Sequence, residues 1–314
     1  MKQSDGYISY IVNPKSGATS SKLIGHRFQK YLLGRGFEVR VRQTRSLEHA
    51  TLLAGEAAGD DACAMVVAVG GDGTVRDVAH GLKGSNKTLL MVPQGTENLL
   101  ASDLGFDERL KTLITTFEAG FLRPLDLGMV DGRCFTSIVG FGFDAQVVKR
   151  VSERRQGNID YNDYFWPFWR TFWDYKYRPM RVEVDGEQVH DGPCLVWVGN
   201  ISRYAMGVKI LNYADSGDGL LDICIYRCGT RPSVLMHTVM TILQRHTKSK
   251  DVLYRQGKNI NVSSDTEGIL SEIDGDPGPV LPVKIDIIPH AVNVMVPENA
   301  KPAGIRTRII RALG

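Results

Sequence analysis

Apolar and polar residues alternate in the first third of the chain as they do where short buried strands are separated by amphipathic helices. Residues 64–69 are all apolar, which is typical of a strand buried on both faces of a parallel sheet. Further strands are predicted at residues 7–12, 37–42 and 88–92. Helices are predicted between them, at residues 47–58 and 75–82 and in a segment that places Leu23, Phe28, Tyr31 and Leu32 near one face. This order of elements predicts a mostly parallel, doubly wound α/β sheet.

After residues 124–127 the pattern changes to short β-prone runs separated by Gly, Asp and Pro. The runs lie at residues 134–139, 180–184, 194–198, 221–226, 260–262 and 283–288. Helices are predicted among them at residues 145–155, 165–177 and 232–244, and residues 300–313 resemble a short basic helix. Such a pattern is typical of a mainly antiparallel β-sandwich.

Length and composition narrow the class of protein. A chain of 314 residues is longer than one compact core usually holds, which favours two domains. The formal charge of +3 gives no indication of a nucleic-acid partner. The 5 cysteines follow no regular spacing, which favours a reducing cytosol. The first residues lack a hydrophobic signal core and no apolar run approaches the ~20 residues that span a bilayer. We therefore expect a cytoplasmic protein, soluble or peripheral at a membrane.

The strongest chemical signal is the string Gly70–Thr74, which follows the apolar strand and precedes a helix. Gly70, Gly71 and Gly73 allow the backbone to approach a phosphate group closely. The helix N-terminus offers free N–H groups and a positive dipole end. The Asp72 carboxylate would repel a phosphate group. Its presence in this loop is explained if it lies beside a magnesium ion or acts as a proton acceptor. The alternative is a glycine-rich turn without a ligand.

Two further loops have a similar design. Asn13–Gly17 and Pro93–Asn98 each follow a predicted strand and precede a predicted helix. Loops at the carboxyl ends of the strands of a doubly wound sheet meet in one crevice. Together the three loops predict a nucleotide site.

With several later motifs, these loops resemble the diacylglycerol kinase catalytic-domain superfamily, which includes soluble bacterial diacylglycerol kinases and sphingosine kinases. The later motifs are Leu125–Gly128, Gly140–Ala145, Asp218–Asp222 and Asp274–Asp276. The resemblance spans nearly the whole chain and implies a phosphofructokinase-like nucleotide domain followed by a β-sandwich domain. We expect these domains at residues 1–128 and 129–289, with the tail, residues 290–314, returning to the first.

The resemblance also implies roles for individual residues. By position, the nucleotide would contact Asn13, Ser16, Gly17, Thr44, Gly70, Gly71, Gly73, Thr74, Gly95, Thr96 and Asn98. Asp72 and Asp126 would be the catalytic carboxylates that organise magnesium and the γ-phosphate of ATP. Asp215, Asp218 and the Leu220 carbonyl would hold a second, structural magnesium ion. Without the resemblance, residues 215–219 would be interpreted as a plain acidic turn.

The triplet Asp274–Asp276 departs from the family pattern, in which the general base is usually the Glu of an Asp-Gly-Glu triplet. Asp276 has the same chemistry, and its side chain is one methylene shorter. A misplacement of ~1 Å can cost about 100-fold in rate. Either the backbone compensates for the shorter side chain or the activity is weak.

Residues 161–177 are unusually rich in aromatic side chains, and Trp166, Trp169 and Trp173 follow helical spacing. Trp and Tyr favour the membrane interface, where an apolar ring meets wet headgroups. This segment is therefore expected to contact the membrane or the acyl chains of a lipid. A helix packed on the sandwich or a contact within a homodimer is the alternative.

These observations predict an ATP- and Mg²⁺-dependent kinase that phosphorylates a lipid hydroxyl at the inner face of the membrane, with diacylglycerol as the expected substrate. Sphingoid bases, ceramide and phosphatidylglycerol are alternative substrates. NAD kinases share the Gly-Gly-Asp-Gly string, but the loops at residues 13–17 and 93–98 favour lipid kinases. A weakly active regulator that binds lipid or nucleotide is the alternative from another class.

Overall fold

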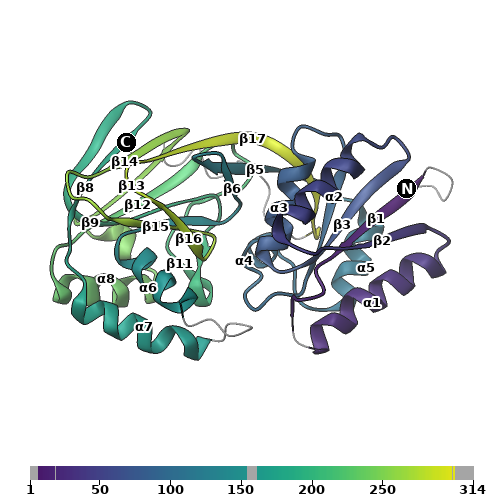
Figure 1. Cartoon of the computed structure of the whole chain (residues 1–314), viewed down its shortest axis with the longest axis horizontal. Helices are drawn as coiled ribbons and strands as arrows, with labels where there is room; N and C mark the ends of the chain where they lie inside the picture. Colours follow the sequence, from purple (N-terminus) through teal and green to yellow (C-terminus); the bar gives the residue numbers. More distant parts are fainter. Residues whose placement is uncertain (1–5, 18, 154–160, 299, 301–314) are drawn as a thin grey trace. The chain divides into compact units, whose positions relative to one another are not determined.

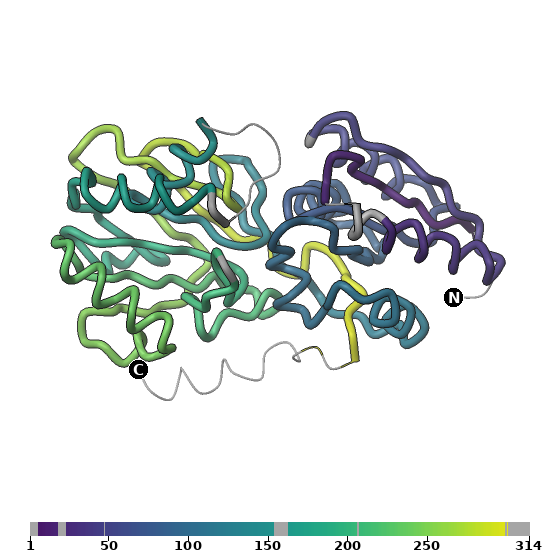
Figure 2. The backbone as a smooth tube through the Cα atoms, turned by 90° about the horizontal axis from the view of Figure 1, so that it is seen from below, coloured from purple at the N-terminus to yellow at the C-terminus, as the bar shows by residue number. Residues whose placement is uncertain are grey.

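The computed structural model describes residues 6–17, 19–153, 161–298 and 300 of the chain. The chain divides into two compact units (Figure 1), and Figure 2 traces the backbone from a second direction. Unit 1 contains Met1–Leu127, Ser216–Asp218 and Pro289–Gly314, and unit 2 contains Gly128–Asp215 and Gly219–Ile288. The helix predicted at residues 300–313 lies, apart from its first residue, outside the described residues.

Unit 1 is built on a parallel sheet with the strand order β2-β1-β3-β4-β17. The strands are β1 (Tyr7–Val12), β2 (Glu38–Gln43), β3 (Cys63–Gly70), β4 (Thr88–Pro93) and the last part of β17 (Val283–Met295), and β5 (Leu122–Val130) pairs with β17. Every residue of β3 except Ala64 is buried, because β3 lies between β1 and β4 with helices on both faces. The doubly wound α/β sheet predicted from the sequence is confirmed.

Helices cover both faces of this sheet (Figure 1). They are α1 (Thr19–Gly34), α2 (Leu47–Gly59), α3 (Asp72–Leu82), α4 (Leu99–Asp103) and α5 (Leu110–Ala119). α2 packs against α3 on one face, and α1 packs against α5 on the other. Phe28 and Leu32 of α1 are fully buried as their spacing predicts, but Leu23 is 50% exposed. The buried face of α1 is therefore shorter than the sequence pattern predicts.

Unit 2 consists mainly of antiparallel strands. They are β6 (Arg133–Phe135), β7 (Ile138–Phe141), β8 (Pro179–Val184), β9 (Glu187–Gly199), β12 (Leu221–Arg227), β13 (Val252–Gly257), β14 (Asn259–Ser263), β15 (Leu270–Ile273), β16 (Asp276–Val280) and the first part of β17, while β10 (Arg203–Tyr204) and β11 (Val208–Lys209) form a separate pair. Residues 187–193 of β9 pair with β8, and residues 194–199 pair with β7 and β12. β9 therefore belongs to both layers of the sandwich.

Successive side chains of β9 enter two different buried clusters. Val196 and Val198 lie inside the sandwich, whereas Leu195 and Trp197 pack toward the helices of unit 2. Because both faces of this strand are buried, residues 194–198 form a continuous apolar run instead of alternating with polar residues. The mainly antiparallel sandwich predicted from the sequence is confirmed.

Three α-helices lie along one side of the strands of unit 2 (Figure 1), with two short 3-10 turns in addition. They are α6 (Phe143–Ser152), α7 (Tyr161–Asp174) and α8 (Arg231–Ile242), with η1 (Ala205–Gly207) and η2 (His246–Lys248). The strand predicted at residues 134–139 is divided into β6 and β7, because the backbone N–H groups of Thr136 and Ser137 donate to the Asp274 carboxylate. Over the residues that the structure describes, no helix is both long enough and apolar enough to cross a bilayer.

Candidate active site

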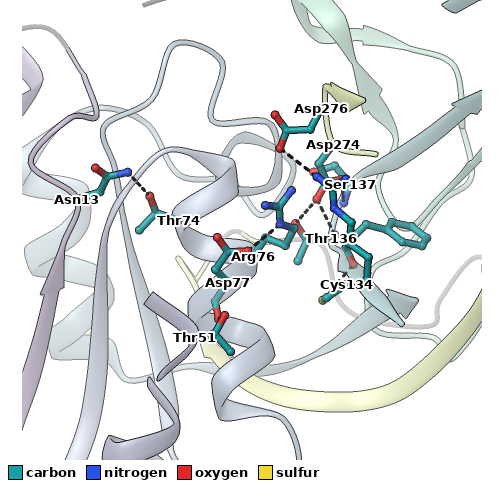
Figure 3. A network of polar contacts seen from close by, with 12 residues as sticks. Asn13, Thr51, Thr74, Arg76, Asp77, Cys134, Thr136, Ser137, Asp274 and Asp276 are labelled. Carbon is teal, nitrogen blue, oxygen red and sulfur yellow. Dashed lines mark hydrogen bonds and ion pairs between the residues drawn. The ribbon is translucent and has the colours of Figure 1, made fainter. Parts of the chain in front are cut away.

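The loop between β3 and α3 carries the string Gly70–Thr74. α3 begins at Asp72, and no side chain caps its N-terminus. A Cβ atom on Gly70 would lie 2.5 Å from Thr74 Oγ1, so a larger residue does not fit. Thr74 Oγ1 accepts a hydrogen bond from Asn13 Nδ2 at 3.0 Å (Figure 3). A helix N-terminus without a side-chain cap, reached by such a tight turn, suits a bound phosphate group.

Asp72 joins this loop to the loop that follows β4. Its Oδ2 accepts the backbone N–H of Leu99 at 3.0 Å, and its Oδ1 accepts that of Leu100 at 3.1 Å. Leu99 and Leu100 are the first two residues of α4, so the carboxylate lies at the positive end of that helix. Sequence reasoning missed this capping role, because the partners lie 27 and 28 residues further along the chain.

The loop after β4 folds around Asn98, whose backbone is left-handed with φ 48° and ψ 48°. Asn98 Oδ1 accepts the N–H of Gly95 at 2.7 Å, and Asn98 Nδ2 donates to the Gly95 carbonyl at 3.0 Å. A Cβ atom on Gly95 would lie 2.6 Å from Gly71 Cα. Glycine at both positions therefore lets the two loops pack backbone against backbone. Asn98 shapes its own loop, while Thr96 is exposed.

The loops after β1 and β2 follow the same end of the sheet. Ser16 N–H donates to the Asn13 carbonyl at 3.2 Å, and Gly17 has a left-handed backbone with φ 78°. Thr44 N–H donates to the Val12 carbonyl at 2.9 Å. The structure thus brings the predicted loops together at the carboxyl ends of β1, β2, β3 and β4. The contact of these residues with a nucleotide stays a prediction.

Asp126 lies on β5 and links three segments of unit 1. Its Oδ1 accepts the backbone N–H of His290 at 2.6 Å, and its own N–H donates to the Ser216 carbonyl at 2.7 Å. A Cβ atom on Gly217 would lie 2.5 Å from the Pro124 carbonyl oxygen. The short segment at residues 216–218 is therefore packed directly on β5.

The residues predicted to hold a structural magnesium ion fall in both units. Asp218 belongs to unit 1, whereas Asp215 and Leu220 belong to unit 2. Within the described part of the chain, no three His, Cys, Asp or Glu residues form a group that could hold a metal ion. A magnesium site can also use one or two carboxylates with carbonyl oxygens and waters. The site at Asp215, Asp218 and Leu220 therefore stays a prediction.

In unit 2, Asp274 and Gly275 form the two-residue turn between β15 and β16. Their φ angles of 50° and 80° are the positive values that a type I′ hairpin turn requires. The Asp274 carboxylate accepts the N–H groups of Thr136 at 3.0 Å and Ser137 at 2.9 Å (Figure 3). Asp274 therefore fixes the turn to the start of β7.

Asp276 begins β16 directly after this turn. Its side chain is 33% exposed, and its Oδ2 lies 3.5 Å from Arg133 Nη2. Arg133 Nη1 donates to the Pro277 carbonyl at 2.9 Å. The candidate base is thus ion-paired with an arginine that also holds the strand after it.

The three tryptophans predicted on one face of a helix lie on α7 with different exposures. Trp166 is 70% exposed, Trp173 59% and Trp169 38%. Phe172 of the same helix is buried in the cluster that includes Phe143 of α6. The helix is therefore confirmed, with an apolar inner face and an exposed aromatic face. Its contact with a membrane or a second copy of the chain stays a prediction.

Sequence reasoning assigned no role to two buried carboxyl groups of unit 2. Burial raises the pKa of Asp144 to about 6. Burial and the neighbouring Asp144 carboxylate raise the pKa of Glu272 well above its usual value. Asp144 belongs to the motif Gly140–Ala145, which was part of the family resemblance. Glu272 belongs to no motif, and only its position before the Asp274 turn could have indicated it.

Comparisons with known proteins cover both units. The diacylglycerol kinase catalytic domain family model matches residues 8–130. The YegS C-terminal NAD kinase beta sandwich-like domain model matches residues 137–296. The two matches together include nearly all of the described residues.

Individual relatives match along almost their full length. The chain is 25% identical over 295 residues to a diacylglycerol kinase of Bacillus subtilis, with 92% of this chain and 96% of that protein covered. It is 27% identical over 316 residues to a diacylglycerol kinase of Mycobacterium tuberculosis, with 94% and 96% covered. A crystal structure of a diacylglycerol kinase from Bacillus anthracis aligns with a TM-score of 0.68 at 18% identity, covering 96% of this chain and 100% of that chain. The structural match shows a shared fold.

Proposed function

The chain belongs to the diacylglycerol kinase catalytic-domain family, and from this premise we propose that it transfers the γ-phosphate of ATP to the free hydroxyl group of diacylglycerol. Membership of this family makes the protein an ATP-dependent lipid kinase. The choice of diacylglycerol as the acceptor is supported by relatives that are named diacylglycerol kinases. These relatives are identical to this chain at about a quarter of the aligned positions. The product of this reaction would be phosphatidic acid.

The observation that carries the proposal is the close backbone packing of two glycine loops of unit 1, the loop after β3 and the loop after β4. Gly71 and Gly95 lie so close together that a Cβ atom on either would crowd the Cα atom of the other. Beside them, α3 presents an N-terminus without a side-chain cap. The backbone N–H groups of its first turn and its positive dipole end are suited to hold the phosphates of ATP. Asn13 supports the loop through Thr74, which leaves the backbone as the surface offered to the nucleotide.

Magnesium prefers hard oxygen ligands, and the carboxylates of Asp72 and Asp126 would hold one ion at the phosphates of ATP. Asp215, Asp218 and the Leu220 carbonyl would hold a second, structural ion. When bound, the first ion would supply positive charge against the phosphate oxygens. The two carboxylate oxygens of Asp72 accept the backbone N–H groups of Leu99 and Leu100. We therefore infer that Asp72 contributes by fixing the two loops as well as by its charge.

Phosphoryl transfer also needs a group that accepts the proton of the attacking hydroxyl. We infer that Asp276 fills this role, because its carboxylate is partly exposed and follows a turn that is fixed by Asp274. The Arg133 guanidinium near Asp276 would have to move or share the carboxylate when the lipid hydroxyl approaches.

The lipid acceptor lies in a bilayer, so the kinase must work at a membrane surface. We propose that the exposed aromatic face of α7, with Trp166, Trp169 and Trp173, contacts the inner face of the cell membrane from the cytoplasm. Exposed aromatic side chains in contact with one another, such as Phe165 and Trp166 at 5.7 Å between ring centroids, support this role. A contact between two copies of the chain would be the alternative use of this face.

The test is transfer from labelled ATP to a panel of acceptors presented in mixed vesicles, with the products identified by mass spectrometry. The panel contains diacylglycerol, sphingosine, ceramide, phosphatidylglycerol and a polyprenol, with NAD in a separate arm. We expect phosphatidic acid as the main product. A labelled product from another arm, with none from diacylglycerol, would reassign the substrate.

A second candidate function has one specific observation in its favour. Asp276 is shorter than the family's usual Glu and is ion-paired with Arg133, so its availability as a base is reduced. A protein with this arrangement could bind ATP and lipid and regulate without appreciable turnover. ATP binding with no transfer to any acceptor of the panel would favour this second function.

A further inference from the structure

Two carboxyl groups of unit 2 lie side by side in its interior. Asp144 on α6 is 9% exposed and Glu272 on β15 is fully buried. A Cβ atom on Gly140 would clash with Asp144 Oδ2 and would lie 2.8 Å from Glu272 Oε1. The two carboxyl oxygens therefore occupy the space above the same glycine, which explains why this position of β7 has no side chain.

The partners of the two groups are known for three of their four oxygens. The Tyr204 hydroxyl donates to Asp144 Oδ1, and Trp197 Nε1 donates to Asp144 Oδ2 at 3.3 Å. Glu272 Oε2 accepts the backbone N–H of Gly275 at 2.8 Å. Glu272 Oε1 is buried and receives no hydrogen bond from any N–H or O–H donor among the described residues.

No cation compensates this pair within the described part of the chain. The titratable groups that act on it are Tyr204 from β10, Asp274 from the turn after β15, and Tyr164 from α7, which acts on Tyr204. All of these are acids or neutral hydroxyl groups. Two neighbouring ionised carboxylates in a buried site would repel each other strongly.

A single proton on the pair would both give Glu272 Oε1 a hydrogen-bonding partner and reduce the repulsion between the two carboxylates. A protonated Glu272 can donate from Oε1 to Asp144 Oδ2, which gives the remaining oxygen a partner and removes one negative charge. Burial raises the pKa of both groups, and that of Glu272 is also raised by the charge of Asp144. The two groups therefore hold one proton between them and titrate as a pair.

The other oxygen of Glu272 reaches the turn that precedes the candidate base. Gly275 N–H donates to Glu272 Oε2, and the Asp274 carboxylate accepts backbone N–H groups at and just before the start of β7. Asp276 follows at the first position of β16. A side chain that keeps Gly275 in place therefore also sets where the Asp276 carboxylate lies.

We propose that Asp144 and Glu272 share one proton and act as positioning residues that fix the turn carrying Asp276. This inference rests on the proposed kinase function, in which Asp276 accepts the proton of the lipid hydroxyl. Both carboxyl groups are buried, so the pair acts on the reaction only through this turn. It holds the turn in place as long as one proton is retained, and loss of that proton brings two buried negative charges together.

The decisive variants are Glu272→Gln and Glu272→Leu. Glutamine keeps an oxygen for Gly275 N–H and offers an NH₂ group to Asp144, but it has no titratable proton. We expect Glu272→Gln to keep kcat within about threefold of the unchanged protein at neutral pH, and Glu272→Leu to lower kcat at least about tenfold through misplacement of Asp276. The KM for ATP should stay unchanged in both, because the ATP loops belong to unit 1. Glu267→Gln, on an exposed glutamate, is the matched control.

A second measurement, the pH dependence of stability, tests the shared proton of Asp144 and Glu272 without any enzymatic turnover. Unfolding by urea is followed from pH 4 to pH 9 for the unchanged protein, Glu272→Gln and Glu267→Gln. The folded-state pKa of Asp144 is raised from 3.8 to about 6, and that of Glu272 is raised well above its ordinary value. Protonation therefore stabilises the fold fully below the unfolded-state pKa values, and this stability is lost as the pH rises through the folded-state values.

We expect the unchanged protein and Glu267→Gln to lose stability over that window and Glu272→Gln to show a flatter profile. Parallel profiles for all three proteins would overturn the shared proton. A flatter profile for Glu272→Gln together with an unchanged kcat for Glu272→Leu would overturn the positioning role. If the unchanged protein transfers phosphate to no acceptor of the panel while the stability profiles differ as expected, the kinase proposal fails and the proton-sharing pair stands.

Discussion

The Oδ2 atom of Asp72 accepts the backbone N–H of Leu99 at 3.0 Å, and this bond connects the glycine loop after β3 to the first turn of α4. A carboxylate in a phosphate-binding turn needs an explanation, because it repels the anion that the turn would hold. The bond to Leu99 gives one, since the positive end of α4 stabilises the charge. The same geometry makes Asp72 important for the fold of the loops as well as for their chemistry.

Asp72→Asn is therefore expected to lower both turnover and stability. An amide offers one acceptor oxygen in place of two, so the N–H of Leu99 or of Leu100 loses its partner and faces an NH₂ group. Loss of such a helix-capping bond costs about 1 kcal/mol. Thermal unfolding and lipid phosphorylation are measured on the same preparation.

The control for this variant is Asp61→Asn, on an exposed aspartate before β3. It should leave both melting and turnover unchanged. Unchanged melting together with near-normal turnover in Asp72→Asn would remove Asp72 from both the loop structure and the chemistry.

Gly95→Ala tests the contact between the two loops. The added Cβ atom would lie 2.6 Å from Gly71 Cα, so one loop has to move away from the other. We expect ATP binding to weaken at least about tenfold, since the backbone surface for the phosphates is displaced. Binding of ATP is measured by calorimetry, without a lipid acceptor.

Gly34→Ala at the end of α1 is the matched glycine control, because nothing lies within 4 Å of its added Cβ atom. It should bind ATP normally and gain stability by about 0.5–1 kcal/mol. Equal ATP affinity in Gly95→Ala and Gly34→Ala would show that the loop contact is not part of the nucleotide site.

The arrangement of the loops in unit 1 could be predicted from sequence because it follows from general rules. The apolar run 64–69 indicated a buried parallel strand, and the carboxyl ends of parallel strands lie at one edge of the sheet. What could not be predicted was how the loop residues pair. Asn98 bonds to Gly95 within its own loop, but Asp72 bonds to Leu99 across two loops. The second contact depends on the tertiary fold and leaves no local pattern in the sequence.

The short β-prone runs in the sequence of unit 2 predicted a mainly antiparallel sandwich, but they indicated only some of its strands. β9 was visible only as residues 194–198, because its earlier half pairs with β8 and is polar and partly exposed. β13, β15 and β16 were not predicted, since their side chains show neither regular alternation nor continuous apolar runs. The buried carboxyl of Glu272 was missed for the related reason that burial of an acid is decided by neighbours from other strands.

A divalent ion is predicted at Asp215 and Asp218, with the Leu220 carbonyl as a third ligand. Chelation of the purified protein should release the ion, lower the melting temperature and reduce turnover, and added Mg²⁺ should restore both. Asp218→Asn should lose the ion, whereas Asp265→Asn, with its side chain 91% exposed, should keep it. A protein that contains no metal and is insensitive to both chelation and Asp218→Asn would contradict the site.

The exposed face of α7 is predicted to contact lipid. Replacing both Phe165 and Trp166 by Ala removes two aromatic side chains that are 57% and 70% exposed. We expect vesicle binding to weaken about tenfold, which corresponds to ~1.4 kcal/mol, while transfer to detergent-solubilised diacylglycerol stays within about twofold. Leu52→Ala, on a leucine of α2 that is 63% exposed, is the control. Unchanged vesicle binding with an altered oligomeric state would assign this face to a dimer contact.

Asp276 is expected to act as the base that accepts the proton of the lipid hydroxyl. Asp276→Asn should lower turnover at least about 100-fold, since positioned proton transfer contributes about 10²–10⁴-fold. Its KM for ATP should stay near that of the unchanged protein. Arg133→Gln is the partner variant, because it removes the guanidinium that lies 3.5 Å from Asp276 Oδ2 and leaves the carboxylate in place. It should change turnover far less than Asp276→Asn.

Asp276→Glu then separates two ways in which the chain could compensate for the shorter acid. If the strand leaves a gap, the longer side chain would raise the rate, and if the backbone is placed for aspartate, it would lower the rate. We expect the rate to fall, because β16 is held at several points after Asp276. Ser271 Oγ donates to the Pro279 carbonyl at 2.5 Å, and a Cβ atom on Gly278 would lie 2.5 Å from that same Oγ. A strand held this closely cannot retreat to make room for an added methylene, so the longer carboxylate would pass the position from which aspartate reaches the lipid hydroxyl. Normal turnover in both Asp276→Asn and Asp276→Glu would show that Asp276 is not the base and would leave Asp72 as the carboxylate to test for that role.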